Sequence, residues 1–534
     1  MNERMDAAAG TIEAGRGVLG IELGSTRIKA CLISDDTSTV LASGSFEWEN
    51  ELRDGQWTYS LDSVWTGLQS AYADLVADVR RQFGVAPRTY RAIGISAMMH
   101  GYLAFDDEGE LLVPFRTWRN TTTGEAAAEL TDLFSANIPL RWSVAHLHQA
   151  VLDAESHVPE LGFLTTLAGY VHWKLTGLKV LGVGDASGMF PIDPATGDFD
   201  AGLVARYDRL VDGGPLLRPL RELLPEVLPA GKPAGELSAD GAKLLDPSGE
   251  LQPGVLLCPP EGDAGTGMVA TNAITPRTGN VSAGTSIFAM VVLERPLQAL
   301  HHEIDIVTTP VGDPVAMVHC NNGANELAAW VGLFQRFSGV AGTPLASDAV
   351  YDILFREALD GEADAGGLLA YNQLAGEPIA GLDAGRPLFV RTPESRLNLA
   401  NLMRTHLYGV FGTLALGMRV LDEEGVALDR MYAHGGMFRT AGVAQRFLAG
   451  ALGAPVSTSR TAGEGGAWGM AVLAAYASSA AETDLATFLH DHVFARTEFL
   501  AAEPSPEDVA GFAAYLDRYR DGLGVVRAAI HAVR

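Results

Sequence analysis

The first 33 residues of this chain carry two short apolar runs separated by small and hydroxyl-bearing residues. One run, Val18–Leu23, ends in Gly-Ser-Thr, and the second, 28–33, follows at once. Two such runs joined by a turn of small residues predict a β-hairpin whose turn is Gly24-Ser25-Thr26-Arg27.

The next part of the chain changes its hydrophobic period from two to between three and four. Apolar side chains recur at this spacing over 64–83, with Ser60 or Asp62 able to begin a helix and Gly84 able to end it. Residues 91–96 predict another strand, which breaks off at Met98-Met99-His100-Gly101. A strand, a helix and a strand in this order indicate a layered α/β domain.

The second half repeats this character after a proline-rich connector. Nine prolines between 215 and 260 predict irregular structure with short elements, and a domain boundary just after it. Beyond it, the ranges 399–421, 443–452 and 467–476 predict helices. The chain therefore predicts an α/β protein with two domains.

Charge and cysteine content limit the partners and the compartment. The chain has 38 Lys+Arg against 65 Asp+Glu, a formal net charge of −27. A field of that sign repels nucleic acid and anionic membranes. Three dispersed cysteines favour a reducing cytoplasm, and the first sixteen residues, with no apolar core, predict a frayed tail rather than a signal peptide.

A short internal repeat links the two halves. Residues 21–26 align without gaps on 281–286, and in both segments a glycine with two following hydroxyl residues ends an apolar run. Sixty glycines in the chain make a chance match the alternative reading. If the repeat is real, each half carries one turn whose N–H groups and hydroxyls are suited to phosphate oxygens; a plain β-turn is the alternative for either one alone.

Two carboxylates stand where chemistry is expected. Glu22 lies in an apolar strand that enters the first turn, where a hydrated Mg²⁺ is a fitting partner; a solvent-facing acid at the strand end is the alternative. Asp263 lies among glycines in Glu261-Gly262-Asp263-Ala264-Gly265 and is a candidate general base for phosphoryl transfer; a turn residue is the alternative.

In this order and spacing, the motifs resemble those of the FGGY family of carbohydrate kinases, within the actin and Hsp70-like ATPase superfamily, and are most similar to xylulokinases. The similar segments are 20–29 and 279–288 for phosphate, 96–101 and 185–188 for the sugar side, 261–265 for the base, and 434–436 and 464–469 for the adenosine side. The resemblance covers residues 17 to about 476.

The resemblance implies two actin-like (ribonuclease H-like) α/β domains, each a mixed sheet flanked by helices, with a cleft between them. Domain 17–272 would bind mainly sugar and domain 273–534 mainly ATP. It implies the cofactors ATP and Mg²⁺, and transfer of the γ-phosphoryl group to a ketopentose, with D-xylulose as the leading candidate. The implied residues are Asp263 as base; Met99, His100, Gly101, Trp118, Asn120 and Asp263 for sugar; Gly24, Ser25, Thr26, Lys29, Gly284, Thr285, Ser286, Gly435, Gly436 and Met437 for ATP; and Glu22 for Mg²⁺ through water.

Two departures from the family pattern affect these expectations. Glu22 stands where the family usually has Asp. Its side chain is one methylene longer, so we expect it to bind Mg²⁺ through a different arrangement of water molecules. Asn120 stands where many members have an acid, so a sugar hydroxyl would meet an amide. L-ribulose, D-ribulose, polyol and sugar-acid kinases therefore stay open, as does an actin-like ATP-binding switch without a sugar substrate. The sequence does not decide between a monomer and a homodimer.

Overall fold

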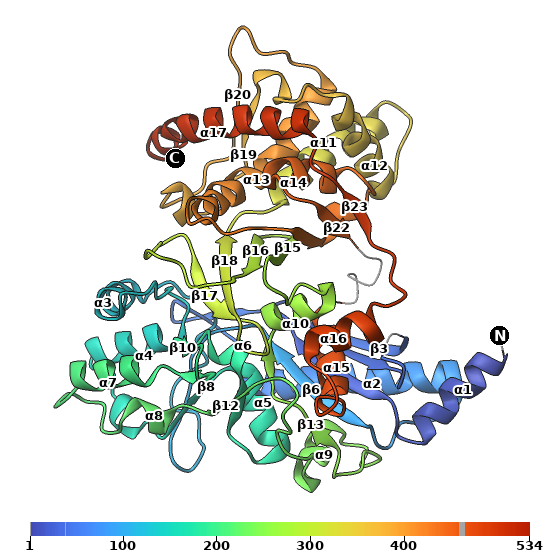
Figure 1. Cartoon of the computed structure of the whole chain (residues 1–534), viewed down its shortest axis with the longest axis vertical. Coiled ribbons are helices and arrows are strands. Elements are labelled where there is room, and N and C mark those ends of the chain that lie inside the picture. The colour runs from blue at the N-terminus through green and yellow to red at the C-terminus, as the bar shows by residue number, and fades with distance from the viewer. Residues whose placement is uncertain (1, 38, 459–464, 534) are drawn as a thin grey trace. The chain divides into compact units, whose positions relative to one another are not determined.

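The computed structural model describes residues 2–37, 39–458 and 465–533. The chain forms two compact units, each with its own β-sheet (Figure 1), which confirms the predicted α/β class with two sheet-containing domains. The chain first passes from unit 1 to unit 2 between residues 274 and 275, and the resemblance implies a boundary between 272 and 273. The segments 306–315 and 464–497 belong to unit 1, where contiguous domains would place them in the second. Unit 1 comprises Met1–Ile274, Ile306–Val315 and Glu464–Thr497; unit 2 comprises Thr275–Asp305, Ala316–Gly463 and Glu498–Arg534.

The main sheet of unit 1 is mixed. Its strands are β1 (Val18–Leu23), β2 (Arg27–Ile33), β3 (Val40–Glu47), β6 (Ala92–Ala97), β13 (Leu256–Leu257) and β14 (Glu261–Gly262). The order is β13-β6-β1-β2-β3, and β14 also pairs with β6. β1 is antiparallel to β2, which confirms the predicted hairpin, and β6 is parallel to β1, β13 and β14. Because helices cover the sheet, β6 is buried along its whole length.

The predicted amphipathic helix is confirmed as α2 (Leu61–Phe83). The Ser60 hydroxyl caps it by accepting from the Ser63 amide, and Gly84 ends it in the left-handed conformation. Its buried face is the one that the spacing predicts and includes Leu68 and Leu75, which pack in the core of unit 1.

The expectation of a frayed N-terminus is wrong. Residues Asn2–Glu13 form helix α1, and Ile12 is buried in the unit 1 core. Arg16, just beyond it, donates to the Asp35 carboxylate at 2.8 Å. Among the described side chains of this helix, Ile12 is buried in the core and Ala8 is partly buried against it, which is less than a full apolar stripe, so only tertiary packing could show where the helix docks.

Helix α15 (Gly465–Ala477) explains why a late segment belongs to unit 1. It packs on β1 and β6, and in Figure 1 its red-orange ribbon lies beside the blue strands. The approach is so close that a Cβ built on Gly20 would stand 2.1 Å from the Ala467 carbonyl oxygen. Glycine in β1 therefore permits contact between backbones.

The rest of unit 1 is built of short elements. The proline-rich range 215–260 holds only short elements, as predicted. The remaining elements of unit 1 are β4 (Glu51–Arg53), β5 (Gln56–Thr58), β7 (Leu103–Phe105), α3 (Gly124–Phe134), α4 (Ser143–Leu152), β8 (Phe163–Thr165), α5 (Leu167–Thr176), β9 (Val180–Gly182), α6 (Val183–Ala186), β10 (Ile192–Asp193), β11 (Asp198–Phe199), α7 (Ala201–Leu210), α8 (Leu220–Leu223), β12 (Glu226–Leu228), α9 (Ala239–Leu245), α10 (Asp263–Thr271) and α16 (Leu485–Phe488).

The second large sheet reproduces the centre of the first. Its strands are β15 (Thr278–Ala283), β16 (Ile287–Val292), β17 (Asp305–Thr308), β18 (Pro314–Cys320), β21 (Arg430–His434), β22 (Val456–Thr458) and β23 (Leu500–Ala502), in the order β17-β18-β16-β15-β21-β22-β23. β15 is antiparallel to β16 and parallel to β21, as β1 is to β2 and β6. This shared pairing supports the sequence repeat. The first turn is one residue longer, since Leu23 pairs with Ile28 and Ala283 with Ile287.

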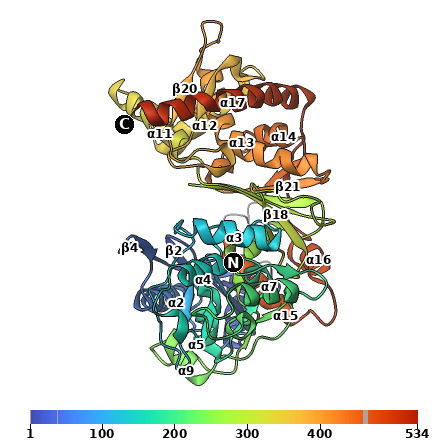
Figure 2. The ribbon, with the colours of Figure 1, turned by 90° about the vertical axis from the view of Figure 1, so that its left-hand side faces the viewer.

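Helices enclose the core of unit 2. The predicted helices 399–421 and 443–452 are confirmed as α13 and α14. The long C-terminal helix α17 packs on both (Figure 2). In the large sheet, residues 306–308 of β17 and 314–315 of β18 are grouped with unit 1. The further elements of unit 2 are α11 (Asn325–Val340), α12 (Ser347–Glu357), β19 (Leu369–Tyr371), β20 (Leu388–Val390), α13 (Leu399–Glu423), α14 (Ala444–Leu452) and α17 (Pro506–Ala532). Within the described residues, no helix combines the length and apolarity that a membrane span requires.

Candidate active site

Three predicted motifs meet at one edge of the unit 1 sheet. The first turn follows β1, Met99-His100-Gly101 follows β6, and Asp263 follows β14. These three strands are parallel, with Leu23 beside Ala97 and Gly262 beside the same Ala97. Because the carboxyl ends of neighbouring parallel strands lie at one edge of a sheet, the topology brings residues up to about 240 positions apart to one place.

Asp263 is joined directly to the Met99 segment. The Met99 amide donates to Asp263 Oδ1 at 3.2 Å. Burial raises the pKa of Asp263 to about 6, although backbone N–H groups, that of Met99 first, stabilise its charged form. A carboxylate with this pKa is ionised at neutral pH and still basic enough to take a proton from a hydroxyl group.

Glu22 lies in β1 opposite Lys29 of β2. Burial raises the pKa of Glu22 to about 7, and the Lys29 charge opposes this rise. A Cβ built on Gly466, in the first turn of α15, would stand 2.2 Å from Glu22 Oε1. Gly465 and Gly466, expected on the adenosine side, therefore lie against Glu22 within unit 1, while Glu464 lies outside the described residues.

The donors near Glu22 limit how a metal ion can be held. Among the residues described, no group of three or more His, Cys, Asp or Glu side chains is placed to hold an ion. Glu22 and Asp263 are oxygen donors close enough to influence each other's charge. Such a set fits Mg²⁺, which keeps several waters and takes further oxygens from phosphates.

Two further buried carboxyl groups, Asp185 and Glu261, were not assigned roles from the sequence; Asp185 is close enough to Asp263 to be affected by its charge. Glu261 accepts from the amides of Gly184 at 3.2 Å and Asp185 at 2.9 Å, and Asp185 accepts from Thr166 Oγ1 at 2.6 Å. Burial raises the pKa of Glu261 to about 8 and that of Asp185 to about 7. The sequence signal that could have pointed to Glu261 is its position two residues before Asp263. The amides that it accepts from, those of Gly184 and Asp185, are almost 80 residues earlier in the chain, so no local pattern indicates the contact.

The first turn is held through its acceptors. Trp48 Nε1 donates to the Gly24 carbonyl at 2.7 Å, and the Tyr59 hydroxyl donates to the Ser25 carbonyl at 2.6 Å. Trp118 Nε1 donates to Ser25 Oγ at 3.2 Å. The amides of Ser25 and Thr26 donate to no described residue. Because the carbonyls of Gly24 and Ser25 accept hydrogen bonds from side chains while the amides of Ser25 and Thr26 remain available, the turn is suited to bind an anion.

His100 has a strained backbone and a defined ring position. Its φ is 71°, uncommon for a residue with a side chain. The ring stacks on Trp142 with a centroid distance of 6.5 Å, and Nδ1 lies 3.2 Å from the Gly188 carbonyl oxygen. Gly188 belongs to the 185–188 segment, so the structure brings two of the sugar-side motifs together. Trp142 was not singled out from the sequence.

Asn120 is occupied by backbone groups. Its Oδ1 accepts from the Trp57 amide at 2.8 Å, and its Nδ2 donates to the carbonyls of Trp57 at 2.8 Å and Thr117 at 3.0 Å. The side chain is buried. In this structure Asn120 joins the Trp118 segment to β5, an arrangement in which the amide has little left for a sugar hydroxyl.

The second turn, in unit 2, accepts hydrogen bonds from the backbone of the segment that follows β18. The amides of Ala324 and Gly323 donate to the carbonyls of Gly284 at 2.9 Å and Thr285 at 2.7 Å. The amides of Thr285 and Ser286 donate to no described residue. In both turns, the carbonyl groups accept hydrogen bonds and two N–H groups remain available. Side chains donate to the carbonyls of the first turn, and backbone amides donate to those of the second.

The His434-Gly435-Gly436-Met437 motif follows β21, the neighbour of β15. Gly435 has φ 110°, and a Cβ there would stand 2.3 Å from the Ala283 carbonyl oxygen. Gly435 and Gly436 are exposed, whereas Met437 is buried in the core of unit 2. The two glycines thus present backbone beside the second turn, and Met437 contributes packing.

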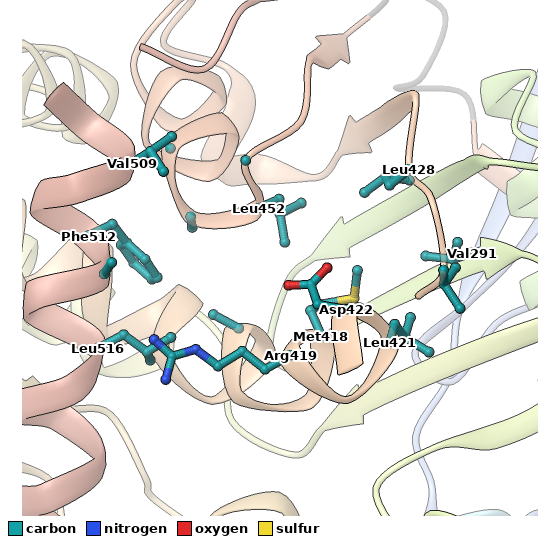
Figure 3. Close-up of a pocket in the computed structure, with 16 residues that line it drawn as sticks. Val291, Met418, Arg419, Leu421, Asp422, Leu428, Leu452, Val509, Phe512 and Leu516 are labelled. Atoms are coloured by element: carbon teal, nitrogen blue, oxygen red, sulfur yellow. The ribbon is translucent and has the colours of Figure 1, made fainter. Parts of the chain in front are cut away.

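Unit 2 also contains a cavity of about 190 Å³ (Figure 3). Apolar side chains from α13, α14 and α17, including Met418, Leu452 and Phe512, line most of it, with Arg419 and Asp422 among them. None of the predicted site residues is among the lining residues. The cavity involves Val291 near the end of β16, whereas the second turn precedes the start of that strand, so it is separate from the turn.

The fold defines a duplicated α/β protein in which each unit carries one turn of glycine and hydroxyl residues between its first two paired strands. Residues 17–247 match the N-terminal domain, and residues 279–478 the C-terminal domain, of the FGGY family of carbohydrate kinases. The chain belongs to this family.

Individual relatives are distant. The chain is 28% identical over 123 residues to the xylulose kinase of Lactococcus lactis subsp. lactis, an alignment that spans 22% of each protein. Two solved structures from Lactobacillus acidophilus share the fold: a xylulose kinase (17% identity, TM-score 0.77) and a gluconate kinase (16% identity, TM-score 0.77). Each comparison covers 97% of this chain and 100% of the other.

Proposed function

We propose that this protein transfers the γ-phosphoryl group of ATP to a terminal hydroxyl of a small sugar, with a ketopentose as the substrate class and D-xylulose as the first candidate. The observation that carries the proposal is the contact between Met99 and Asp263 at the sheet edge that also bears the first turn. It joins the sugar-side motif, the base and a phosphate-type turn in one unit.

In this reaction the sugar hydroxyl oxygen forms a bond to the γ-phosphorus while the bond from that phosphorus to the β–γ bridging oxygen breaks, and ADP leaves. Asp263 Oδ accepts the hydroxyl proton. The available amides of each turn are suited to phosphate oxygens, and Lys29 balances the charge of Glu22. Mg²⁺ bound through water near Glu22 would neutralise charge on the phosphates.

Substrate identity rests on a few hydroxyl contacts, and the related structures include a gluconate kinase as well as xylulose kinases. L-ribulose, D-ribulose, polyols and sugar acids are therefore the alternatives. A coupled ADP-release assay across ketopentoses, polyols and aldonates tests the proposal. D-xylulose should give the highest kcat/KM; a higher value for gluconate or glycerol would replace the proposed substrate.

The alternative of another class is an actin-like ATP-binding switch. It uses the two turns but needs neither the Met99–Asp263 contact nor the ordered His100 ring. Sugar-dependent ADP release separates the two, because a switch would hydrolyse ATP at the same rate with and without sugar. A cytoplasmic location remains a prediction from the sequence, and the choice between a monomer and a homodimer stays open.

Substitution of Gly284 by valine should weaken ATP binding by at least about tenfold and leave folding intact. A Cβ at Gly284 meets only the Ser286 carbonyl oxygen, at 3.9 Å, so the protein itself has room for the side chain. The branched side chain would instead occupy space through which phosphate approaches the backbone. Calorimetry with ATP measures the change; unaltered affinity would remove this turn from the phosphate site.

Substitution of His100 by alanine should raise the KM for sugar at least about tenfold and the KM for ATP less than about twofold. The ring, stacked on Trp142 beside Gly188, lies among the sugar-side motifs of unit 1. Because His100 has a positive φ, His100→Asn is the matched variant: asparagine tolerates this backbone but lacks the ring. Equal effects on both KM values would indicate that His100 only supports the fold.

A further inference from the structure

The second turn depends on the segment that follows β18. Gly323 and Ala324 donate to the turn carbonyls, and a Cβ built on Gly323 would stand 2.3 Å from the Gly284 carbonyl oxygen and 2.8 Å from Ser286 C. The backbone of this segment is therefore in direct contact with the turn. A displacement of Gly323 would therefore act directly on the turn carbonyls.

A second layer of side chains fixes that segment. Asn372 Nδ2 donates to the carbonyls of Gly323 at 2.8 Å and Asn322 at 3.3 Å. Asn322 Oδ1 accepts from the amides of Leu374 at 2.8 Å and Ala375 at 2.9 Å. Thus 322–323 and the loop after β19 are bonded to each other in both directions.

Glu377 completes this layer. Its Oε2 accepts from the Asn322 amide at 3.2 Å and from Asn322 Nδ2 at 3.0 Å. The side chain is fully buried, and among the described residues Oε1 has no hydrogen-bond partner. Burial raises the pKa of Glu377 to about 7, while the Asn322 bonds oppose this rise. Burying a carboxyl group costs free energy, so packing alone does not explain an acid here.

We propose that Asn322, Asn372 and Glu377 form a clamp of positioning residues that holds the second phosphate turn in its binding conformation. This inference rests on the proposed function, because it assigns ATP phosphates to that turn. The clamp acts only through Gly323 and Ala324, and none of its side chains reaches the turn itself. The first turn, held by Trp48 and Tyr59, has no counterpart of this device among its contacts in the described structure.

The test compares Asn372→Leu and Glu377→Leu with a matched control, Asn401→Leu. Asn401 is an equally buried amide of unit 2 that accepts from the Glu362 amide and donates to the Arg396 carbonyl, away from the turn. All three variants lose a buried hydrogen-bonded side chain, so their losses of stability should be similar. Glu377→Gln retains an acceptor for Asn322 and is the conservative rescue.

Two measurements on the full chain decide the matter. Hydrogen exchange without nucleotide should show the Gly323 and Ala324 amides exchanging about tenfold faster in both clamp variants and unchanged in Asn401→Leu. Calorimetry should show the Kd for ATP about tenfold higher in the clamp variants, within threefold of wild type in Glu377→Gln, and unchanged in Asn401→Leu.

Unchanged exchange at Gly323 and Ala324 would overturn the clamp. Faster exchange with unaltered ATP affinity would also overturn it, because the clamp would then not position the turn for phosphate. A wild-type protein that does not bind ATP would refute the proposed function instead. In that case the exchange data still decide whether the clamp holds the turn.

Discussion

Asp263→Asn is expected to lower kcat by about 10²- to 10⁴-fold while leaving both KM values within about threefold of wild type. Asparagine retains the size of the side chain and an oxygen that accepts from the Met99 amide, but it cannot take the proton of the sugar hydroxyl. Steady-state kinetics with D-xylulose and ATP measure the loss. The melting temperature provides the control for folding.

The pH profile of kcat gives the same residue a second test. Burial raises the pKa of Asp263 to about 6, and the base must be deprotonated to act. The rate should therefore fall as pH drops below about 6, where Asp263 becomes protonated. Asp263→Asn should lose this acid limb. A folded Asp263→Asn enzyme with ordinary turnover and an unchanged profile would show that Asp263 is only the first residue of α10.

Gly20→Ala is expected to destabilise unit 1 by about 3 kcal/mol or more. The new Cβ would stand 2.1 Å from the Ala467 carbonyl oxygen and 2.4 Å from the Ala471 amide nitrogen. Both are backbone atoms of α15, so no side-chain rotation can relieve the clash, and the helix must move away from β1. Denaturant unfolding followed by circular dichroism measures the change.

Gly10→Ala is the matched control for this substitution. Gly10 lies in α1, where a Cβ has nothing within 4 Å, so alanine should leave stability unchanged or raise it by up to about 1 kcal/mol. Equal midpoints for Gly20→Ala and wild type would mean that α15 does not depend on close contact with β1.

Local patterns were sufficient for the elements around the site. The hairpin of β1 and β2, the caps of α2 and the helix α13 follow from apolar spacing, a serine and a glycine, all within a few residues of each other. The repeat at 24 and 284 indicated two equivalent turns, and the shared pairing of β15 with β16 and β21 supports that interpretation. Asp263 could be identified as a candidate base because it is an acidic residue flanked by glycines in Glu261-Gly262-Asp263-Ala264-Gly265.

Other features depend on contacts between residues far apart in the chain. Helix α1 contributes Ile12 and, partly, Ala8 to the core, too weak a pattern to predict this contact from the sequence. The family resemblance assigns Gly465 and Gly466 to the adenosine side; the tertiary structure shows in addition that α15 packs on β1 and places them against Glu22. The side chain of Asn120 forms hydrogen bonds with the backbone amide and carbonyl of Trp57, 63 residues earlier in the chain.

By itself, the sequence determined the α/β class and the elements with the clearest local patterns, such as the β1–β2 hairpin and helices α2, α13 and α14, because period, capping and turn chemistry act over a few residues. The tertiary structure alone decided that Met99 donates to Asp263 and that Glu377 supports the segment behind the second turn. Those hydrogen bonds join residues 164 and 55 positions apart. Only the pairing of parallel strands and the packing of loops on them can bring such groups within 3 to 4 Å, and no local pattern records it.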